Sequence, residues 1–220
     1  MHHELRVFDD DAALASAAAE YAADRARRVR TRRTPFAFAV SGGTSPWLMM
    51  RDLANEDVRW DHTIFFQVDE RVVDVDSDLR NFKHLRDSLA TTSAPIEPMG
   101  VEEPDLDEAC RQYAAKLPAR FDLIHLGLGP DGHCASLIPN DPVLDVTDRL
   151  VALSGPYQDT RRMTLTYPAL ARADHLLWLI SGADKREALA KLLDADPSIP
   201  AGRVKAGSSL ILADRAAVTP

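Results

Sequence analysis

The sequence predicts an α/β fold: a mostly parallel, Rossmann-like sheet with helices on both faces, in a single domain over residues 1–220. Three observations predict it. Short apolar runs alternate with longer amphipathic segments, as strands and helices do in α/β domains. Polar and glycine-rich clusters follow several of the apolar runs, and open parallel sheets bind ligands beyond the carboxyl ends of their strands. The chain has 220 residues, enough for one domain, and no linker divides it.

The first half of the chain predicts three strands and four helices. Acidic residues precede the first helix and arginines end it, an order that suits the helix dipole. Pro46 stands where a helix can begin, because the first turn does not need its missing N–H. The predicted strands are Leu5–Phe8, Phe36–Val40 and Ile64–Val68; the helices are Asp11 to about Arg30, Pro46–Leu53, Ser77–Leu89 and Leu106–Lys116. Three prolines between Thr91 and Pro104 predict a loop there.

The second half predicts four more strands with one helix between the last two. The apolar runs are short enough for buried strands. The strands are Phe121–Leu126, Met163–Thr166, His175–Ile180 and Ser209–Leu212, and the helix is Ala183–Leu193.

Composition excludes several classes of function. The net charge is −8 and the isoelectric point about 5.3, which argues against general nucleic-acid binding. An arginine-rich stretch from Arg25 to Arg33 fits the end of the first helix, with a nucleic-acid contact as the alternative. No apolar stretch can span a membrane and no secretory signal opens the chain. With only two cysteines, we expect a cytoplasmic protein. We also expect a monomer or a weak dimer.

The segment Ser41–Pro46 has the composition of a phosphate-binding loop. Gly42 and Gly43 allow close approach of the backbone to a ligand, while Thr44 and Ser45 supply hydroxyl donors. A helix that begins here points free N–H groups and its positive end at the loop. The segment lacks the Gly-Lys-Ser/Thr ending of a Walker loop. A plain Gly-Ser turn is the alternative.

The triplet Asp69-Glu70-Arg71 follows a predicted strand, at its carboxyl end. An arginine there can stabilise a carbonyl oxygen as it gains negative charge. The two acids can orient Arg71 or bind sugar hydroxyls. A group of surface ion pairs is the alternative.

The segment Gly127–Pro139 carries a glycine-rich turn with Asp131 and His133. It satisfies G-x-G-x-x-G, but Pro139 leaves no room for the sustained helix that a dinucleotide site requires. A neutral imidazole is a suitable base for activating water near pH 7, and a neighbouring carboxylate can fix its tautomer. Cysteine and histidine spacing does not match a zinc site, so we expect no metal and no cofactor.

Three further cations stand near predicted strand or helix ends. Arg162 precedes the run Met163–Thr166, and Lys185 lies near the start of a helix. Either can neutralise a phosphate held by the first loop. Arg161 fits solvated surface charge better than the other two do.

Taken in order, these motifs resemble those of the 6-phosphogluconolactonases over nearly the whole chain. The resemblance rests on Ser-Gly-Gly-Thr-Ser-Pro at 41–46, Asp-Glu-Arg at 69–71, Gly-Leu-Gly-Pro-Asp-Gly-His-Cys-Ala-Ser-Leu-Ile-Pro at 127–139, Arg-Met-Thr-Leu-Thr at 162–166 and Gly-Ala-Asp-Lys at 182–185. It implies hydrolysis of 6-phospho-D-glucono-1,5-lactone to 6-phosphogluconate in the pentose phosphate pathway. It also implies a fold shared with glucosamine-6-phosphate deaminases and ribose-5-phosphate isomerases.

The resemblance also implies roles for the site residues. His133, steadied by Asp131, would activate water, and Arg71 would stabilise charge on the lactone oxygen. The loop Gly43–Ser45, Lys185 and Arg162 would bind the phosphate. Three departures stand out: Thr44 and Ser45 are exchanged, Cys134 and Ile138 replace the common threonine and phenylalanine, and Arg80 replaces a serine before Asn81.

Two other functions remain as alternatives. Deaminases of the related family carry a glutamate after the Asp-Gly-His motif, and the matching residue here is Ile138, which transfers no protons. A non-catalytic phosphosugar-binding domain is the second alternative, but regulators of that kind need a DNA-binding module, for which this acidic chain has no room.

Overall fold

Seven parallel strands form the centre of the computed structural model, which describes residues 2–29 and 31–219. Hydrogen-bonded neighbours run in the order β1 (His3–Phe8), β10 (Ser208–Asp214), β9 (His175–Ile180), β6 (Leu123–Gly127), β2 (Phe36–Val40), β3 (Thr63–Gln67) and β5 (Ile96–Glu97). Because all seven are parallel, their carboxyl ends meet at one edge of the sheet. The predicted mostly parallel α/β fold is confirmed.

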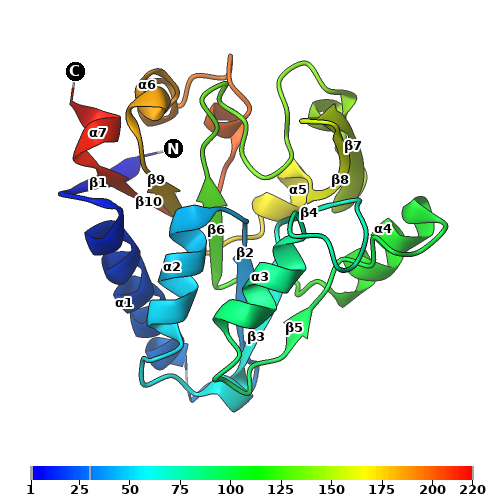
Figure 1. Cartoon of the computed structure of the whole chain (residues 1–220), viewed down its shortest axis with the longest axis horizontal. Helices are drawn as coiled ribbons and strands as arrows, with labels where there is room; N and C mark the ends of the chain where they lie inside the picture. The colour runs from blue at the N-terminus through cyan, green and yellow to red at the C-terminus, as the bar shows by residue number, and fades with distance from the viewer. Residues whose placement is uncertain (1, 30, 220) are drawn as a thin grey trace.

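Helices cover both faces of this sheet (Figure 1). On one face lie α1 (Asp11–Val29), α2 (Thr44–Leu53) and α3 (Asn81–Ser88). On the other lie α4 (Leu106–Lys116), α5 (Tyr167–Leu170), α6 (Arg186–Leu193) and α7 (Arg215–Val218). Short 3₁₀ turns complete the chain at η1 (Trp60–His62), η2 (Pro142–Asp145), η3 (Ala183–Lys185) and η4 (Ala201–Arg203).

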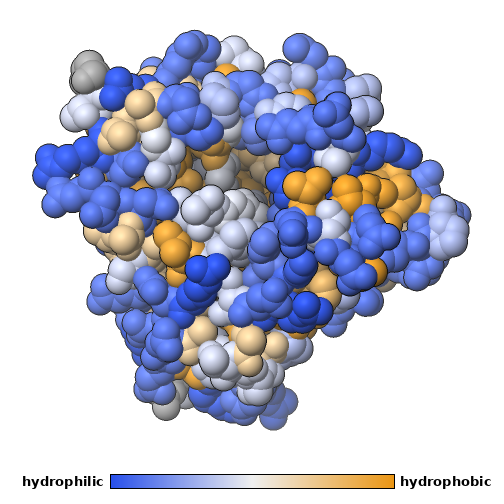
Figure 2. Space-filling view, in the orientation of Figure 1, coloured by the Kyte–Doolittle hydropathy of each residue, from blue (hydrophilic) through white to orange (hydrophobic). Residues whose placement is uncertain are grey.

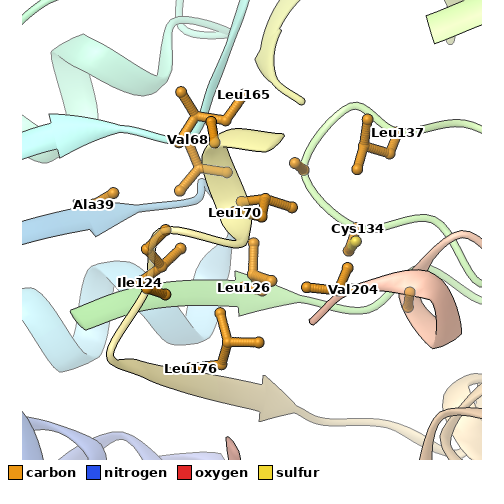
Figure 3. Packing of buried hydrophobic residues seen from close by; sticks show 14 of the residues in the cluster. Ala39, Val68, Ile124, Leu126, Cys134, Leu137, Leu165, Leu170, Leu176 and Val204 are labelled. Atoms are coloured by element: carbon orange, nitrogen blue, oxygen red, sulfur yellow. The ribbon is translucent and has the colours of Figure 1, made fainter. Parts of the chain in front are cut away.

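Side chains that alternate along each strand supply two separate cores. In β2, Phe38 and Val40 pack against α1–α3, while Ala37 and Ala39 belong to the opposite core. Alternation puts successive residues of a strand on opposite faces, and here both faces are buried. Figure 3 shows part of the core on the α4–α7 face of the sheet, with Cys134 pointing in among Leu126 and Val204. The loop after β6 is therefore anchored by apolar packing as well as by hydrogen bonds.

A second, antiparallel sheet stands beside the main one, to its right in Figure 1. It contains β4 (Asp69–Arg71), β8 (Thr160–Leu165) and β7 (Val151–Tyr157). Two main-chain bonds join it to the main sheet through Val68, which donates to Val40 O and accepts from Leu165 N. The small sheet is thereby held next to the carboxyl ends of β2 and β3.

Several predicted boundaries need correction. The second helix begins at Thr44, so Pro46 lies within its first turn and not at its first residue. The third helix begins at Asn81, four residues later than predicted, because residues 77–80 form turns around Asp74 and Ser77. The predicted loop 91–104 contains the two-residue strand β5, and Ala183–Leu193 divides into η3 and α6. Arg30, the predicted end of the first helix, lies outside the described residues.

Two elements of the small sheet were not predicted as strands. Asp69–Arg71 was expected only to follow a strand at its carboxyl end, but it forms a strand of its own, β4, that pairs with Arg162–Thr164. Strand β7 was missed because its sequence contains Gly155 and Pro156, which interrupt an apolar pattern. Among residues 2–29 and 31–219, no helix is long and apolar enough to cross a membrane.

Candidate active site

The predicted site residues converge at the carboxyl ends of four adjacent strands, β9, β6, β2 and β3. A cavity of about 410 Å³ opens there. Figure 2 shows the hollow in the upper middle of this face, over the end of β6, with hydrophilic residues around most of its rim. Of the predicted residues, the cavity is lined by Gly42, Asp69, Arg71, His133, Arg162 and Lys185.

His133 and Asp131 form a hydrogen-bonded pair on the loop after β6. Nδ1 of His133 lies 2.6 Å from Oδ1 of Asp131, and the same oxygen accepts the His133 N–H at 3.2 Å. Partial burial by itself raises the pKa of Asp131, but hydrogen bonds from His133 and Tyr157 outweigh it and lower the pKa. An ionised Asp131 holds the proton of the imidazole on Nδ1, which leaves Nε2 as the acceptor.

The glycine spacing of this loop is needed for the imidazole to fit. The backbone closes on itself, since Gly129 donates to His133 O at 2.8 Å and Gly132 donates to Gly129 O at 3.0 Å. A methyl group on Gly129 would overlap the His133 ring and contact the Asp131 carboxylate. The ring therefore lies directly against the glycine backbone, and the first part of the G-x-G-x-x-G pattern here makes room for a histidine side chain.

Arg71 and Arg162 are cross-strand neighbours that both face the cavity. Arg162 is only 5% exposed, and its Nε has no hydrogen-bond partner in the described part of the chain. Burial lowers the pKa of Arg162, the Asp69 charge opposes this, and Arg71 adds to the lowering. Neither arginine forms an ion pair with a carboxylate among the described residues. Two adjacent cations that form no direct ion pair with a carboxylate make an anion-binding surface.

Asp69 connects three distant stretches of the chain. Its Oδ2 accepts a 2.6 Å hydrogen bond from the hydroxyl of Ser136, on the histidine loop. The backbone N–H of Ser136 donates to Oγ1 of Thr164, which pairs with Asp69 across β4 and β8. All three side chains are buried. Asp69 thus fixes the histidine loop against the strand that carries Arg71, a structural link that its predicted ligand role did not include.

Glu70 organises the neighbouring junction between β4 and α3. Its buried carboxylate accepts N–H bonds at 2.8 Å from the backbone of Arg71, Asn81 and Phe82, and from the side chain of Gln67. The negative charge of the two Glu70 oxygens lies at the start of α3 and suits the positive end of that helix. Arg80 is buried beside Glu70 at 3.3 Å and also contacts Glu102 at 2.5 Å. The cation that departs from the family pattern is therefore a buried structural partner of Glu70.

Asn81 is a cavity residue whose role the sequence did not predict. Its Oδ1 accepts from Arg71 Nη1 at 2.9 Å, and its amide donates to Asp69 O at 3.0 Å. A methyl group on Gly42 would overlap its carboxamide. Asn81 therefore fixes the position of Arg71 between the first and second motifs. The available signal was the polar side chain at the start of a helix that follows Asp-Glu-Arg.

The phosphate-loop candidates lie in an adjoining recess of about 480 Å³, which shares Gly42, Gly127, Leu128 and Lys185 with the main cavity. Gly43, Thr44 and Ser45 line only this recess. Helix α2 begins here without a side-chain cap, so its first N–H groups are open to a ligand. Ser45 donates its hydroxyl to Asp11 at 2.5 Å, and Lys185 Nζ lies 2.9 Å from Asp184. The sequence had not drawn attention to Asp11.

Several other candidates lie outside the site. Arg161 lines a separate cavity beside α4 and β7, so of the arginine pair it is Arg162 that faces His133. Burial raises the pKa of the Cys134 thiol, and its side chain is in the core, so it is no nucleophile. Tyr157 and Gln158 of the β7–β8 hairpin, by contrast, do line the cavity, although no pattern in the sequence pointed to them. Within the described residues, no group of three or more His, Cys, Asp or Glu could hold a metal ion.

Comparison with known proteins places this geometry in a family. The family model described as glucosamine-6-phosphate isomerases/6-phosphogluconolactonase matches residues 9–212. A 6-phosphogluconolactonase of Mycobacterium tuberculosis is 33% identical, over 98% of this chain and 97% of its own. One from Synechocystis sp. is 36% identical, over 72% of each chain.

Solved structures agree with these relatives. A 6-phosphogluconolactonase from Thermotoga maritima superposes with a TM-score of 0.88 and 27% identity, covering 97% of this chain and 100% of its own. A monomeric glucosamine-6-phosphate deaminase superposes with a TM-score of 0.86 at 18% identity, covering 97% and 98%, a likeness of fold alone. The resemblance predicted from the motifs is confirmed. The chain belongs to the glucosamine-6-phosphate isomerase/6-phosphogluconolactonase family.

Proposed function

We propose that this chain hydrolyses 6-phospho-D-glucono-1,5-lactone to 6-phospho-D-gluconate, a step of the oxidative pentose phosphate pathway. The observation that carries the proposal is the His133–Asp131 pair at a cavity that is also lined by Arg71 and Arg162, neither of which forms an ion pair with a carboxylate among the described residues. A base beside an anion-stabilising surface is what ester hydrolysis requires. The relatives named 6-phosphogluconolactonase support the same reaction.

In the proposed mechanism, Nε2 of His133 takes a proton from water as the water oxygen attacks the lactone carbonyl carbon. Asp131 stabilises the imidazolium that forms. The negative charge that develops on the carbonyl oxygen is stabilised by Arg71, with Arg162 beside it. The bond between that carbon and the ring oxygen then breaks, and the ring oxygen takes the proton back from His133. General-base help is worth roughly 10²–10⁴-fold in rate.

The phosphate of the substrate occupies the adjoining recess. Open N–H groups at the start of α2 and the ammonium of Lys185 supply donors and positive charge there. Lys185 lines both spaces, so one substrate can reach from the recess to His133. The Ser45 hydroxyl already donates a hydrogen bond to Asp11. The main-chain N–H groups of the loop therefore contribute more to phosphate binding than this hydroxyl does.

Deaminase chemistry, the alternative within the family, is disfavoured by one residue. Ring opening in that reaction needs a proton-transferring carboxylate after the Asp-Gly-His motif, and the matching position holds buried Ile138. The likeness to the deaminase structure is one of fold and does not bear on this position.

The direct test is a hydrolysis assay on freshly prepared lactone, corrected for spontaneous ring opening. We expect enzymatic turnover, and a loss of roughly 10²–10⁴-fold in kcat for His133→Ala with substrate binding retained. As a matched control, His2→Ala changes an exposed histidine and keeps wild-type turnover. Unchanged turnover in His133→Ala contradicts the role of His133 as the base. Release of ammonia from glucosamine 6-phosphate favours deaminase activity instead.

A further inference from the structure

Tyr157 stands at the end of β7, against the histidine pair. Its hydroxyl donates to Oδ2 of Asp131 at 3.2 Å and lies 3.4 Å from Nδ1 of His133. The two rings meet edge to face, with centroids 5.0 Å apart and planes at 63°. Tyr157 is thus the second side chain, after Asp131, that contacts the imidazole on the side away from its free nitrogen.

The other side of Tyr157 is held by Arg162. The guanidinium lies over the phenol ring, 5.1 Å from its centroid, and Nη2 is 3.5 Å from the Tyr157 carbonyl and 3.4 Å from Oε1 of Gln158. Gln158 and Asp159 both have positive φ, 50° and 61°, as a tight two-residue hairpin turn requires. The hairpin therefore fixes the ring between Arg162 and the histidine pair.

We propose that Tyr157 is a positioning residue for the reaction: its hydroxyl and ring fix the Asp131 carboxylate and the His133 imidazole so that Nε2 faces the bound lactone. This inference rests on the hydrolytic function proposed above. No sequence motif suggested it, since Tyr157 lies in a hairpin that apolar patterning did not reveal.

Each Asp131 oxygen then has its own donor. Oδ1 accepts from the His133 ring and backbone, while Oδ2 accepts from Tyr157. Asp131 is 36% exposed on a loop whose neighbouring residues are mostly buried, so one hydrogen-bonded oxygen alone would leave its carboxylate plane free to turn. Burial, and then the charge of Asp131, raises the pKa of Tyr157, so the phenol keeps the proton that it donates.

The test compares Tyr157→Phe with wild type by steady-state kinetics and by ¹⁵N NMR of the His133 ring. Tyr157→Phe keeps the ring contacts but removes the hydroxyl, and we expect kcat to fall roughly 3- to 10-fold while KM stays within about twofold. In wild type we expect the ¹⁵N signals to show one tautomer, protonated at Nδ1. In the variant we expect them to broaden or move towards a mixture of tautomers. Tyr157→Leu also removes the ring contacts, and we expect a larger fall in kcat.

The matched control is Tyr21→Phe, the same chemical change on α1, outside the cavity. It keeps wild-type kinetics and ¹⁵N signals. If Tyr157→Phe leaves both kcat and the ¹⁵N signals unchanged, the positioning role is wrong. The two proposals fail separately: a wild-type protein without lactonase activity overturns the proposed function, whereas the NMR comparison still decides whether Tyr157 fixes the imidazole.

Discussion

Gly129 is the residue against which the imidazole of His133, the proposed base, lies. Because a methyl group there overlaps the His133 ring, the Gly129→Ala protein must displace this imidazole. A displacement of about 1 Å can cost roughly 10²-fold in rate, so we expect a loss of that order in kcat with the fold retained. The control Gly100→Ala has space for its methyl group, with the nearest atom at 3.6 Å. Wild-type kinetics for Gly129→Ala contradict the seating of His133.

Lys185 is the cation that borders both the main cavity and the recess. Removing it takes a charge from the proposed phosphate site and leaves His133 and Arg71 in place. Lys185→Ala should raise KM on the order of 10- to 100-fold with a much smaller change in kcat. Lys191→Ala removes an exposed lysine paired with Glu187 and serves as the control. A fall in kcat alone would show that the phosphate binds elsewhere.

At the scale of elements, the junction of β4 with α3 depends on Glu70. Replacing its carboxylate in Glu70→Gln puts an N–H donor where only N–H donors point, and leaves buried Arg80 with Glu102 as its single charged partner. Breaking a buried ion pair costs roughly 3–5 kcal/mol of unfolding free energy. Chemical denaturation measures this loss.

The matched control for that junction is Glu102→Gln, which alters the other carboxylate beside Arg80. Glu102 is 45% exposed, so we expect it to cost at most about 1 kcal/mol. Equal stability losses for the two variants would contradict the view that Glu70 organises the junction. Glu70→Gln should also lower activity, because the same carboxylate holds the backbone of Arg71.

Local patterning predicted the elements of the main sheet well and the small sheet poorly. Phe36–Val40, Leu106–Lys116 and His175–Ile180 have the predicted bounds, because an apolar run or helical period is visible without knowledge of tertiary contacts. β4 and β7 depend on pairing with β8, and their sequences, Asp-Glu-Arg and a run broken by Gly155, carry no strand pattern. Tyr157, which β7 places beside His133, could not be found for the same reason.

Three of the motif residues were predictable because they follow patterned strands of the main sheet. His133, Lys185 and Arg71 follow β6, β9 and β3, whose carboxyl ends lie at one edge of the parallel sheet. Arg162 instead lies within β8 and reaches the same cavity through its pairing with Arg71. The contacts that join the motifs were not predictable. Ser136 and Glu70 stand inside motifs and Asn81 between two of them, but all three act through contacts between separate segments, which spacing along the chain does not record.

At the scale of the whole molecule, a buried histidine should link stability to pH. His125 of β6 is fully buried, and neither ring nitrogen has a hydrogen-bond partner among the described residues. Burial lowers its pKa to about 3, against 6.5 for an ordinary histidine. Above pH 6.5 it is neutral in both states and pH has no effect through this group. Below that, only the unfolded chain binds the proton, so stability falls until about pH 3.

The expected contribution is a loss of about 1.4 kcal/mol of unfolding free energy per pH unit between pH 6 and pH 4. Denaturation curves at several pH values measure it. His125→Leu removes this proton and should flatten the dependence by that amount, whatever its effect at pH 7. His2→Leu, an exposed control, keeps the wild-type slope. An unchanged slope in His125→Leu would show that His125 is not the group responsible.

The proposed reaction depends most on one arrangement: a phosphate held at the start of α2, with the reacting carbonyl between His133 and the arginine pair. A crystal structure of the chain with 6-phosphogluconate bound tests it directly. We predict the phosphate at Gly43–Ser45 and Lys185, and the new carboxylate at Arg71 and Arg162, within reach of Nε2 of His133. A ligand bound in the reverse direction, or in the cavity beside Arg161, contradicts it.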